Sequence, residues 1–207
     1  MDSNRSRANR IAVERAAGRL AAVDMRARTV LHGLPPPGAD GEIRVAAYGS
    51  DIRLLPPYTG AVHADSGKLA HPVDHLLVLR YLLCDTPLDA DGPPVSFRDL
   101  PGGQFYWEPF LSRTVLPLAA TIGNRLDSLR ERLDGLGAAP FAGGDAGGRV
   151  ACIGRLGISL AYYAGDDEFP PSAAIFFDVS VRRAFSTDDA AAMAQRLCGI
   201  LCDPLAR

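Results

Sequence analysis

The clearest pattern of hydrophobic and polar positions lies in residues 158–181 and predicts a β-hairpin. Every second residue from Ile158 to Tyr162 is large and apolar, and a period of two is typical of a strand. Residues 173–181 are almost continuously apolar, which favours a central strand covered on both faces. Asp178 interrupts this run, and a buried carboxylate needs a partner. Between the two runs, a glycine, three carboxylates and two prolines predict an acidic turn.

Shorter segments with β-branched and apolar residues predict the other strands. These segments are residues 29–34, 42–47, 51–55 and 149–154. The middle two are joined at Tyr48-Gly49-Ser50, which suits a tight hairpin turn. The last of them is expected to join the sheet beside this hairpin. Residues 58–71 and 142–148 are rich in loop-forming residues and are expected to lack regular structure.

Apolar residues at helical spacing predict the helices. The helical segments are residues 9–23, 73–83, 110–123 and 124–136, and a closing helix follows Ser186. Ser186 is a favourable N-cap, and the two acids after Thr187 suit the positive end of the helix dipole. Pro117 is expected to kink or divide the third of these helices.

Together these elements predict an α+β fold, with a mainly antiparallel sheet of about five strands packed against four or five helices. A chain of 207 residues is most simply one domain, which we place at residues 9–207 after a disordered tail at residues 1–8. Hydrophobic residues make up 47% and charged residues 22% of the chain, as in ordinary globular proteins.

Charge and composition narrow the classes of partner. The formal net charge of −2 offers no global attraction for nucleic acid or for an anionic membrane. No apolar run is long enough to span a bilayer, and the charged N-terminus lacks the apolar centre of a signal peptide. We therefore expect a cytoplasmic protein that acts on a small-molecule ligand or a partner protein. Its four cysteines contain no CxxC pair, so they are expected to be thiols and not a zinc ribbon.

Residues 165–171, here called the acidic turn, are one candidate site. Asp166, Asp167 and Glu168 are adjacent carboxylates, and with Asp178 on the next strand they could offer oxygen ligands to a hard cation. Asp166 and Asp167 are the metal-ligand candidates. The alternative is a solvated loop, because loop tips are commonly polar for solvation alone.

Residues 105–108, here called the aromatic segment, are a second candidate. The segment contains Tyr106, Trp107 and Glu108 and follows a Gly-Gly turn. Trp107 is the single tryptophan of the chain, and aromatic walls beside polar groups are typical of ligand pockets. The alternative is an aromatic plug that closes one end of the core.

The histidines offer a weaker signal for a metal site. His71 and His75 are four residues apart, and on one helix they would share a face, as in zinc-binding helices. Pro72 and an N-cap around it place His71 outside the helix, so surface histidines are the alternative.

Several motifs in a fixed order resemble a known family. They are Leu-Arg-Tyr-Leu-Leu at 79–83, Ser-Phe-Arg-Asp-Leu-Pro-Gly-Gly at 96–103, Tyr-Trp-Glu-Pro-Phe at 106–110, Gly-Asp-Asp-Glu-Phe-Pro-Pro at 165–171, Ile-Phe-Phe-Asp-Val-Ser at 175–180 and Ser-Thr-Asp-Asp at 186–189. Over roughly residues 25–203 the chain resembles the prokaryotic family called domain of unknown function 3786. Some members look fused to an iron–sulphur motif of corrinoid type, which implies tetrapyrrole, corrinoid or one-carbon chemistry. This chain lacks that cysteine motif, and Arg80 stands where we expect members often to carry histidine.

The first hypothesis is a small enzyme or cofactor-binding protein. Its pocket would form where Arg98 and the aromatic segment meet the acidic turn. The catalytic candidates are Glu168 as acid or base, Arg98 and Glu108, and either Arg98 or Arg113 would bind an anion.

From the resemblance, haem or a corrinoid is the first cofactor candidate. The planar ring would stack on Tyr106 or Trp107, and His75 would be the axial ligand. The second hypothesis is a non-catalytic binding or scaffolding subunit. In that case Arg98 or Arg113 would pair with Asp178, and the aromatic residues would fill the core.

Overall fold

The strands form one antiparallel sheet. A computed structural model describes residues 2–89 and 92–203, with side chains from Arg7 onward. The strands are β1 (Ile43–Ala47), β2 (Ser50–Leu54), β3 (Ala61–His63), β4 (Val95–Ser96), β5 (Ala146–Ile153), β6 (Leu156–Tyr163) and β7 (Ser172–Phe177). Within the described residues they make a seven-stranded sheet in the order β3-β2-β1-β5-β6-β7-β4. The α+β class and the antiparallel pairing are therefore confirmed.

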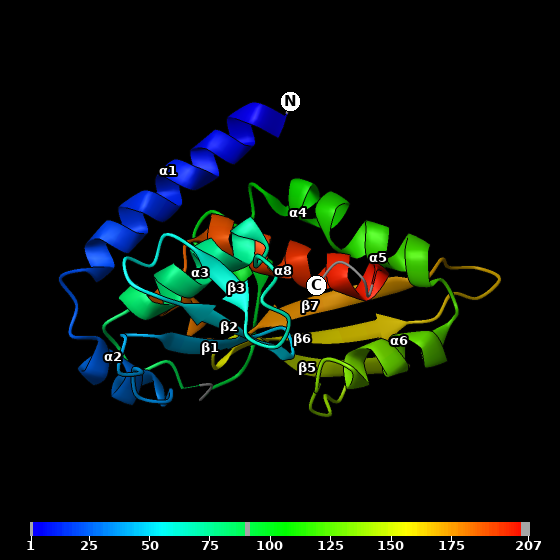
Figure 1. Ribbon diagram of the computed structural model, residues 1–207. Coiled ribbons are helices and arrows are strands. Elements are labelled where there is room, and N and C mark those ends of the chain that lie inside the picture. Colours follow the sequence, from blue (N-terminus) through cyan, green and yellow to red (C-terminus); the bar gives the residue numbers. More distant parts are fainter. Residues whose placement is uncertain (1, 90–91, 204–207) are drawn as a thin grey trace.

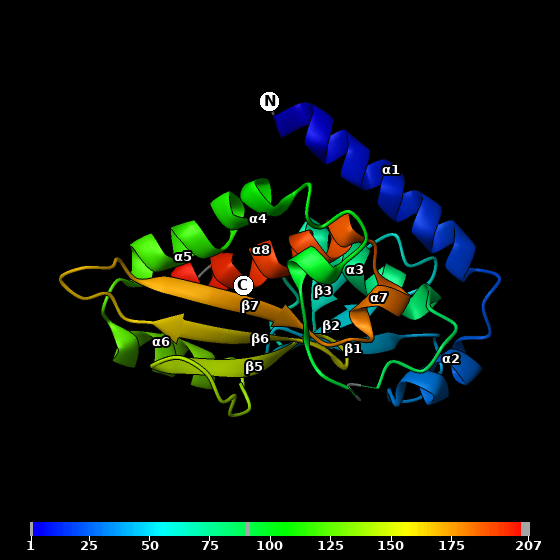
Figure 2. The ribbon, with the colours of Figure 1, turned by 180° about the vertical axis from the view of Figure 1, so that it is seen from behind.

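Helices pack against the sheet and around its edges (Figures 1 and 2). They are α1 (Asp2–Leu20), α2 (Met25–His32), α3 (Pro72–Leu83), α4 (Trp107–Arg113), α5 (Val115–Ile122), α6 (Leu126–Asp134), α7 (Val181–Ala184) and α8 (Thr187–Cys202), with a 3-10 turn η1 (Phe97–Asp99). In Figures 1 and 2, α4, α5 and α8 lie above strands β5–β7. Both views also show α1 leading away from the body, so that the N-terminal half of this helix stands clear of the sheet.

The predicted hairpin of β6 and β7 is confirmed, but the expectation that the second strand is covered on both faces is wrong, because β7 ends at Phe177 and only Ile175 and Phe177 are buried within it. Residues of β6 up to Tyr162 are buried, and Tyr162 donates a hydrogen bond to the carbonyl of Gly123 at 2.8 Å. The small residues that alternate with the large ones face the other side, where a Cβ on Gly157 would contact the Arg149 side chain. The alternation therefore reflects two differently covered faces of one strand.

Asp178 forms an ion pair with Arg149, whereas the second hypothesis paired it with Arg98 or Arg113. The Nε of Arg149 donates to Oδ1 of Asp178 at 3.0 Å, and Nη2 donates to Oδ2 at 2.5 Å. The amide of Gly157 donates to the same carboxylate at 2.7 Å. The predicted pairing is wrong because β5 places Arg149 across β6 from the end of β7, which no local pattern indicates.

The strand predicted at residues 29–34 is wrong, because this segment belongs mostly to helix α2. Asp24 caps the helix, and its carboxylate accepts hydrogen bonds from the amides of Arg26 and Ala27 at 3.0 Å each. At the other end, Gly33 takes the left-handed conformation that commonly ends a helix. These two caps outweigh the weak strand preference of the few β-branched residues between them.

The estimate of about five strands was too low, because β3 and β4 are very short edge strands. β3 lies in the segment expected to be a loop and pairs with β2, while β4 pairs with the end of β7. Runs of three and two residues carry no recognisable period. Pairing with a neighbouring strand decides their structure.

Two helix boundaries also differ from the expectation. The helix expected at residues 110–123 divides at Thr114 and not at Pro117. Pro117 lies in the first turn of α5, where a missing N–H costs little. Helix α1 starts at Asp2, within the segment expected to be disordered, and Met1 lies outside the described residues.

One contiguous set of buried apolar residues joins the sheet to the helices. Helix α8 is central to it, and its apolar residues Met193, Leu197, Ile200 and Leu201 are buried. The predicted cap of α8 is confirmed, since Ser186 and Asp189 form a reciprocal capping box. Among the described helices, none has both the length and the apolar character needed to cross a membrane.

Candidate functional site

The structure does not bring the two predicted parts of the site together. The acidic turn precedes Ser172, at the start of β7. Arg98 and the aromatic segment follow β4, which pairs with Phe176 and Phe177 at the other end of the same strand. A strand rises about 3.3 Å per residue, so roughly 15 Å of sheet separates the two parts.

The acidic turn is a self-contained, exposed loop. Oδ1 of Asp166 accepts hydrogen bonds from the amides of Glu168 and Phe169, at 2.9 and 2.8 Å. These hydrogen bonds hold the pKa of Asp166 below its ordinary value. Asp167 and Glu168 are exposed, and the fourth carboxylate, Asp178, is bound to Arg149 instead. Within the described residues, no group of three His, Cys, Asp or Glu side chains is placed to hold a metal ion.

The aromatic segment is partly structural and partly exposed. The guanidinium carbon of Arg98 lies 4.4 Å from the centre of the Trp107 ring, and Trp107 also stacks on Phe110. The Arg98 guanidinium therefore covers ring surface of Trp107 on which a planar ligand would rest. Tyr106 is 59% exposed, and Glu108 and Arg113 are exposed on the same short helix. Thus Trp107 helps to close the core, while its neighbours face solvent.

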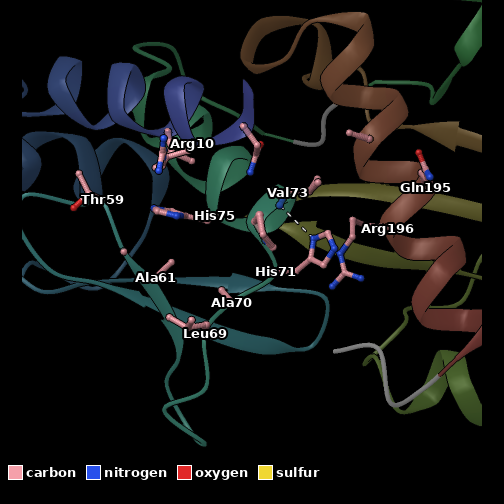
Figure 3. A pocket seen from close by; sticks show the side chains of 15 residues that line it. Arg10, Thr59, Ala61, Leu69, Ala70, His71, Val73, His75, Gln195 and Arg196 are labelled. Atoms are coloured by element: carbon pink, nitrogen blue, oxygen red, sulfur yellow. Dashed lines mark hydrogen bonds between the residues drawn. The ribbon is translucent and has the colours of Figure 1, made fainter. Parts of the chain in front are cut away.

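A groove on another part of the molecule contains the predicted residue His75. The groove has a volume of about 750 Å³ and lies between α1, the segment around β3, the start of α3 and α8. Its lining residues come from four separate parts of the chain. They are Asn9, Arg10, Val13, Thr59, Gly60, Ala61, Leu69, Ala70, His71, Pro72, Val73, His75, Ala192, Gln195 and Arg196. Figure 3 shows Arg10, Thr59 and His75 at one end and His71, Gln195 and Arg196 at the other.

His75 is buried in the first turns of α3 and has a defined hydrogen bond. Its Nε2 lies 3.0 Å from the carbonyl oxygen of Tyr58, so Nε2 must carry the proton and donate it. Burial lowers the pKa of His75 below its ordinary value, which keeps the ring neutral at pH 7. In this tautomer Nδ1 is unprotonated and can accept a hydrogen bond or a proton.

His71 precedes helix α3, as the sequence predicted. It is the N-cap of α3, and its Nδ1 accepts a hydrogen bond from the amide of Val73 at 3.2 Å (Figure 3). Pro72 occupies the first turn, where no N–H is needed. His71 and His75 therefore line one groove, although their hydrogen bonds make His71 a helix cap and His75 a donor to the Tyr58 carbonyl.

A buried ion pair holds the far wall of the groove in place. Arg196 of α8 donates from Nε and Nη2 to the two carboxylate oxygens of Asp74, at 2.9 and 2.7 Å. The Arg196 guanidinium also faces the ring of Tyr48 at 5.9 Å. These contacts tie α8 to the start of α3 and hold the two walls at a constant separation.

Most of the groove was not predicted from the sequence. The sequence predicts His75 as a cofactor ligand and offers His71 and His75 as a weak metal signal, but it does not indicate Arg10, Gln195 or Arg196. The one part of the groove with a local sequence signal is the start of α3, where the motif His-Pro-x-Asp at residues 71–74 predicts a helix start with polar groups. The residues of α1 and α8 gave no such signal, because they read as ordinary positions on amphipathic helices.

These features define the molecule as an α+β protein with one antiparallel sheet, a covering layer of helices and a groove beside α3. A sequence model of the family described as "Domain of unknown function (DUF3786)" matches residues 33–199, and the chain belongs to this family. No curated protein and no solved structure matches the chain. Three walls of the groove lie inside the matched residues, whereas α1 lies before them.

Proposed function

We propose that this protein binds a polar small molecule in the groove beside α3. The observation that carries the proposal is the state of His75, a buried neutral imidazole with one nitrogen fixed on the Tyr58 carbonyl and the other an acceptor. A ligand with an N–H or O–H group can donate a hydrogen bond to this acceptor nitrogen. The polar side chains of Asn9, Thr59 and Gln195 on the same surface add further hydrogen-bonding groups.

A tetrapyrrole held by the predicted residues does not fit this arrangement. Among the described residues that line the groove there is no Phe, Tyr or Trp on which a macrocycle could stack. Tyr106 and Trp107 lie outside the lining, and the Nε2 of His75 is already engaged. The groove therefore does not suit haem or a corrinoid. The proposed ligand is a polar molecule that needs no aromatic side chain to stack on.

The test is a ligand screen followed by amide chemical shifts. A set of neutral polar fragments (amides, diols and nitrogen heterocycles) is added to the ¹⁵N-labelled protein, and the amides of Val73, His75 and Gln195 are followed. A groove ligand should shift these amides in a saturable way. His75→Gln keeps a donor for the Tyr58 carbonyl and removes the Nδ1 acceptor, so it should weaken binding about tenfold.

The control variant is His63→Gln, which changes a buried histidine outside the groove lining. It should leave fragment binding unchanged. Haem and a corrinoid are added in parallel and followed by their visible spectra. A spectral shift that disappears in the His75 variant would contradict the proposal and support the tetrapyrrole hypothesis.

The alternative of a binding or scaffolding subunit has one specific observation in its favour. Phe105, Tyr106 and Leu116 are 88%, 59% and 58% exposed and are close in sequence around α4 and α5. Clustered exposed apolar side chains are typical of contact surfaces for other proteins. If this surface binds a partner, Tyr106→Ala should weaken that complex and leave binding of fragments to the groove unchanged.

A further inference from the structure

The charged side chains among the described residues of the groove lining are two arginines, Arg10 and Arg196. The lining contains two guanidinium groups and two imidazole rings, and among its described residues there is no Asp or Glu. The carboxylate of Asp74 is bound to Arg196 and offsets the charge of that guanidinium, so Arg10 is the arginine of the lining that can attract a ligand. A concave surface that contains an accessible guanidinium and no carboxylate in its lining favours a negatively charged ligand.

Arg10 is the cationic side chain that is most accessible to a ligand. It forms an ion pair with Glu14, one turn along α1, with 4.0 Å between Nε of Arg10 and Oε1 of Glu14. The two side chains are 72% and 60% exposed, and an exposed pair at this distance is weak. Arg10 can therefore exchange this contact for an anion in the groove at little cost.

The start of α3 contributes to the same electrostatic field. The helix has 12 residues, and its N-terminus opens on the groove at Pro72 and Val73. The positive end of the helix dipole attracts anions. His75, in the second turn, is only 7% exposed. Arg10 and His75 lie at the same end of the groove in Figure 3.

We infer that the groove binds a small organic oxyanion, a carboxylate or a phosphate ester, with the charged oxygen on Arg10. An O–H or N–H group on the same ligand donates to Nδ1 of His75. This inference rests on the proposed function and adds the charge of the ligand to it. A guanidinium suits both anions because its donors match two oxygens of a carboxylate or a phosphate.

The experiment titrates the protein with sodium phosphate and, separately, with sodium succinate, while sodium chloride keeps the ionic strength constant. The amide shifts of Asn9, Arg10 and His75 are measured in the wild type, in Arg10→Gln and in Arg15→Gln. Arg15 is an exposed arginine on the same helix outside the groove lining, so it is a matched control. We expect saturable shifts, weakened about tenfold by Arg10→Gln and unchanged by Arg15→Gln. Comparison of the two anions identifies which oxyanion the groove prefers.

Equal weakening by both variants, or shifts that rise linearly without saturation, would overturn the inference, since they indicate general screening of surface charge. If neutral fragments bind to the groove and neither anion does, the inference fails and the proposed function stands. If neither neutral fragments nor anions bind, both fail.

Discussion

Asp74 and Arg196 are 122 positions apart in the chain and form a buried, bidentate ion pair between α3 and α8. Their side chains are 2% and 10% exposed. The pair joins the two helices that form opposite walls of the groove. Removing one member of such a pair leaves the other charge buried without a partner.

Asp74→Asn should lower the free energy of unfolding by about 3–5 kcal/mol. The control is Asp89→Asn, which removes the carboxylate of a half-exposed pair with Arg155 and should cost at most about 1 kcal/mol. Urea unfolding followed by Trp107 fluorescence measures both. Equal costs for the two variants would show that the buried pair does not contribute as described. Combining Asp74→Asn with Arg196→Met should recover part of the loss.

Stability should fall as the pH is lowered below about 6.5, the ordinary pKa of histidine. Burial lowers the pKa of both His32 and His75 in the folded protein. Below pH 6.5 the unfolded chain therefore binds protons that the folded protein does not, which favours unfolding until the folded pKa values are reached. Each histidine contributes up to about 1.4 kcal/mol per pH unit in this window.

Urea unfolding at pH 7.0 and at pH 5.5 measures this dependence. The double variant His32→Gln with His75→Gln has no imidazole at either position, so its stability should change much less between the two pH values. If the double variant keeps the full pH dependence of the wild type, other groups are responsible.

Gly103→Ala should be strongly destabilising. A Cβ at position 103 would overlap the carbonyl oxygen of Phe97, which is backbone and cannot move aside. We expect a cost of about 1–3 kcal/mol or more, as for other overpacked sites. Gly199→Ala is the control, because a Cβ there meets nothing within 4 Å and Ala favours a helix by up to about 1 kcal/mol. Thermal unfolding of both variants would separate them, and a stable Gly103→Ala would contradict the tight turn.

Asp166 should order the acidic turn, while its neighbours should be replaceable. Its carboxylate accepts two backbone hydrogen bonds, so Asp166→Ala should speed hydrogen exchange at the amides of Glu168 and Phe169. Asp167→Asn removes an exposed charge and should leave these exchange rates unchanged. Hydrogen exchange followed by NMR reads both amides directly. Equal effects of the two variants would mean that charge, and not the hydrogen bonds of Asp166, holds the turn.

The sequence by itself determined the elements whose stability is local. The alternation from Ile158 to Tyr162 and the apolar run before Asp178 identified the central hairpin. The Ser-Thr-Asp-Asp motif at residues 186–189 identified the start of α8, because a capping box forms between residues three apart. The family followed from the order of such short motifs.

The tertiary structure decided what depends on residues far apart in the chain. Arg149 became the partner of Asp178, the two short edge strands formed by pairing, and the acidic turn was placed away from the aromatic segment. The groove could not be predicted for the same reason, because residues of α1, β3, α3 and α8 line it and no sequence motif links these elements. Local periodicity reports which face of an element is buried. The neighbours across that face are set by the packing of the whole chain.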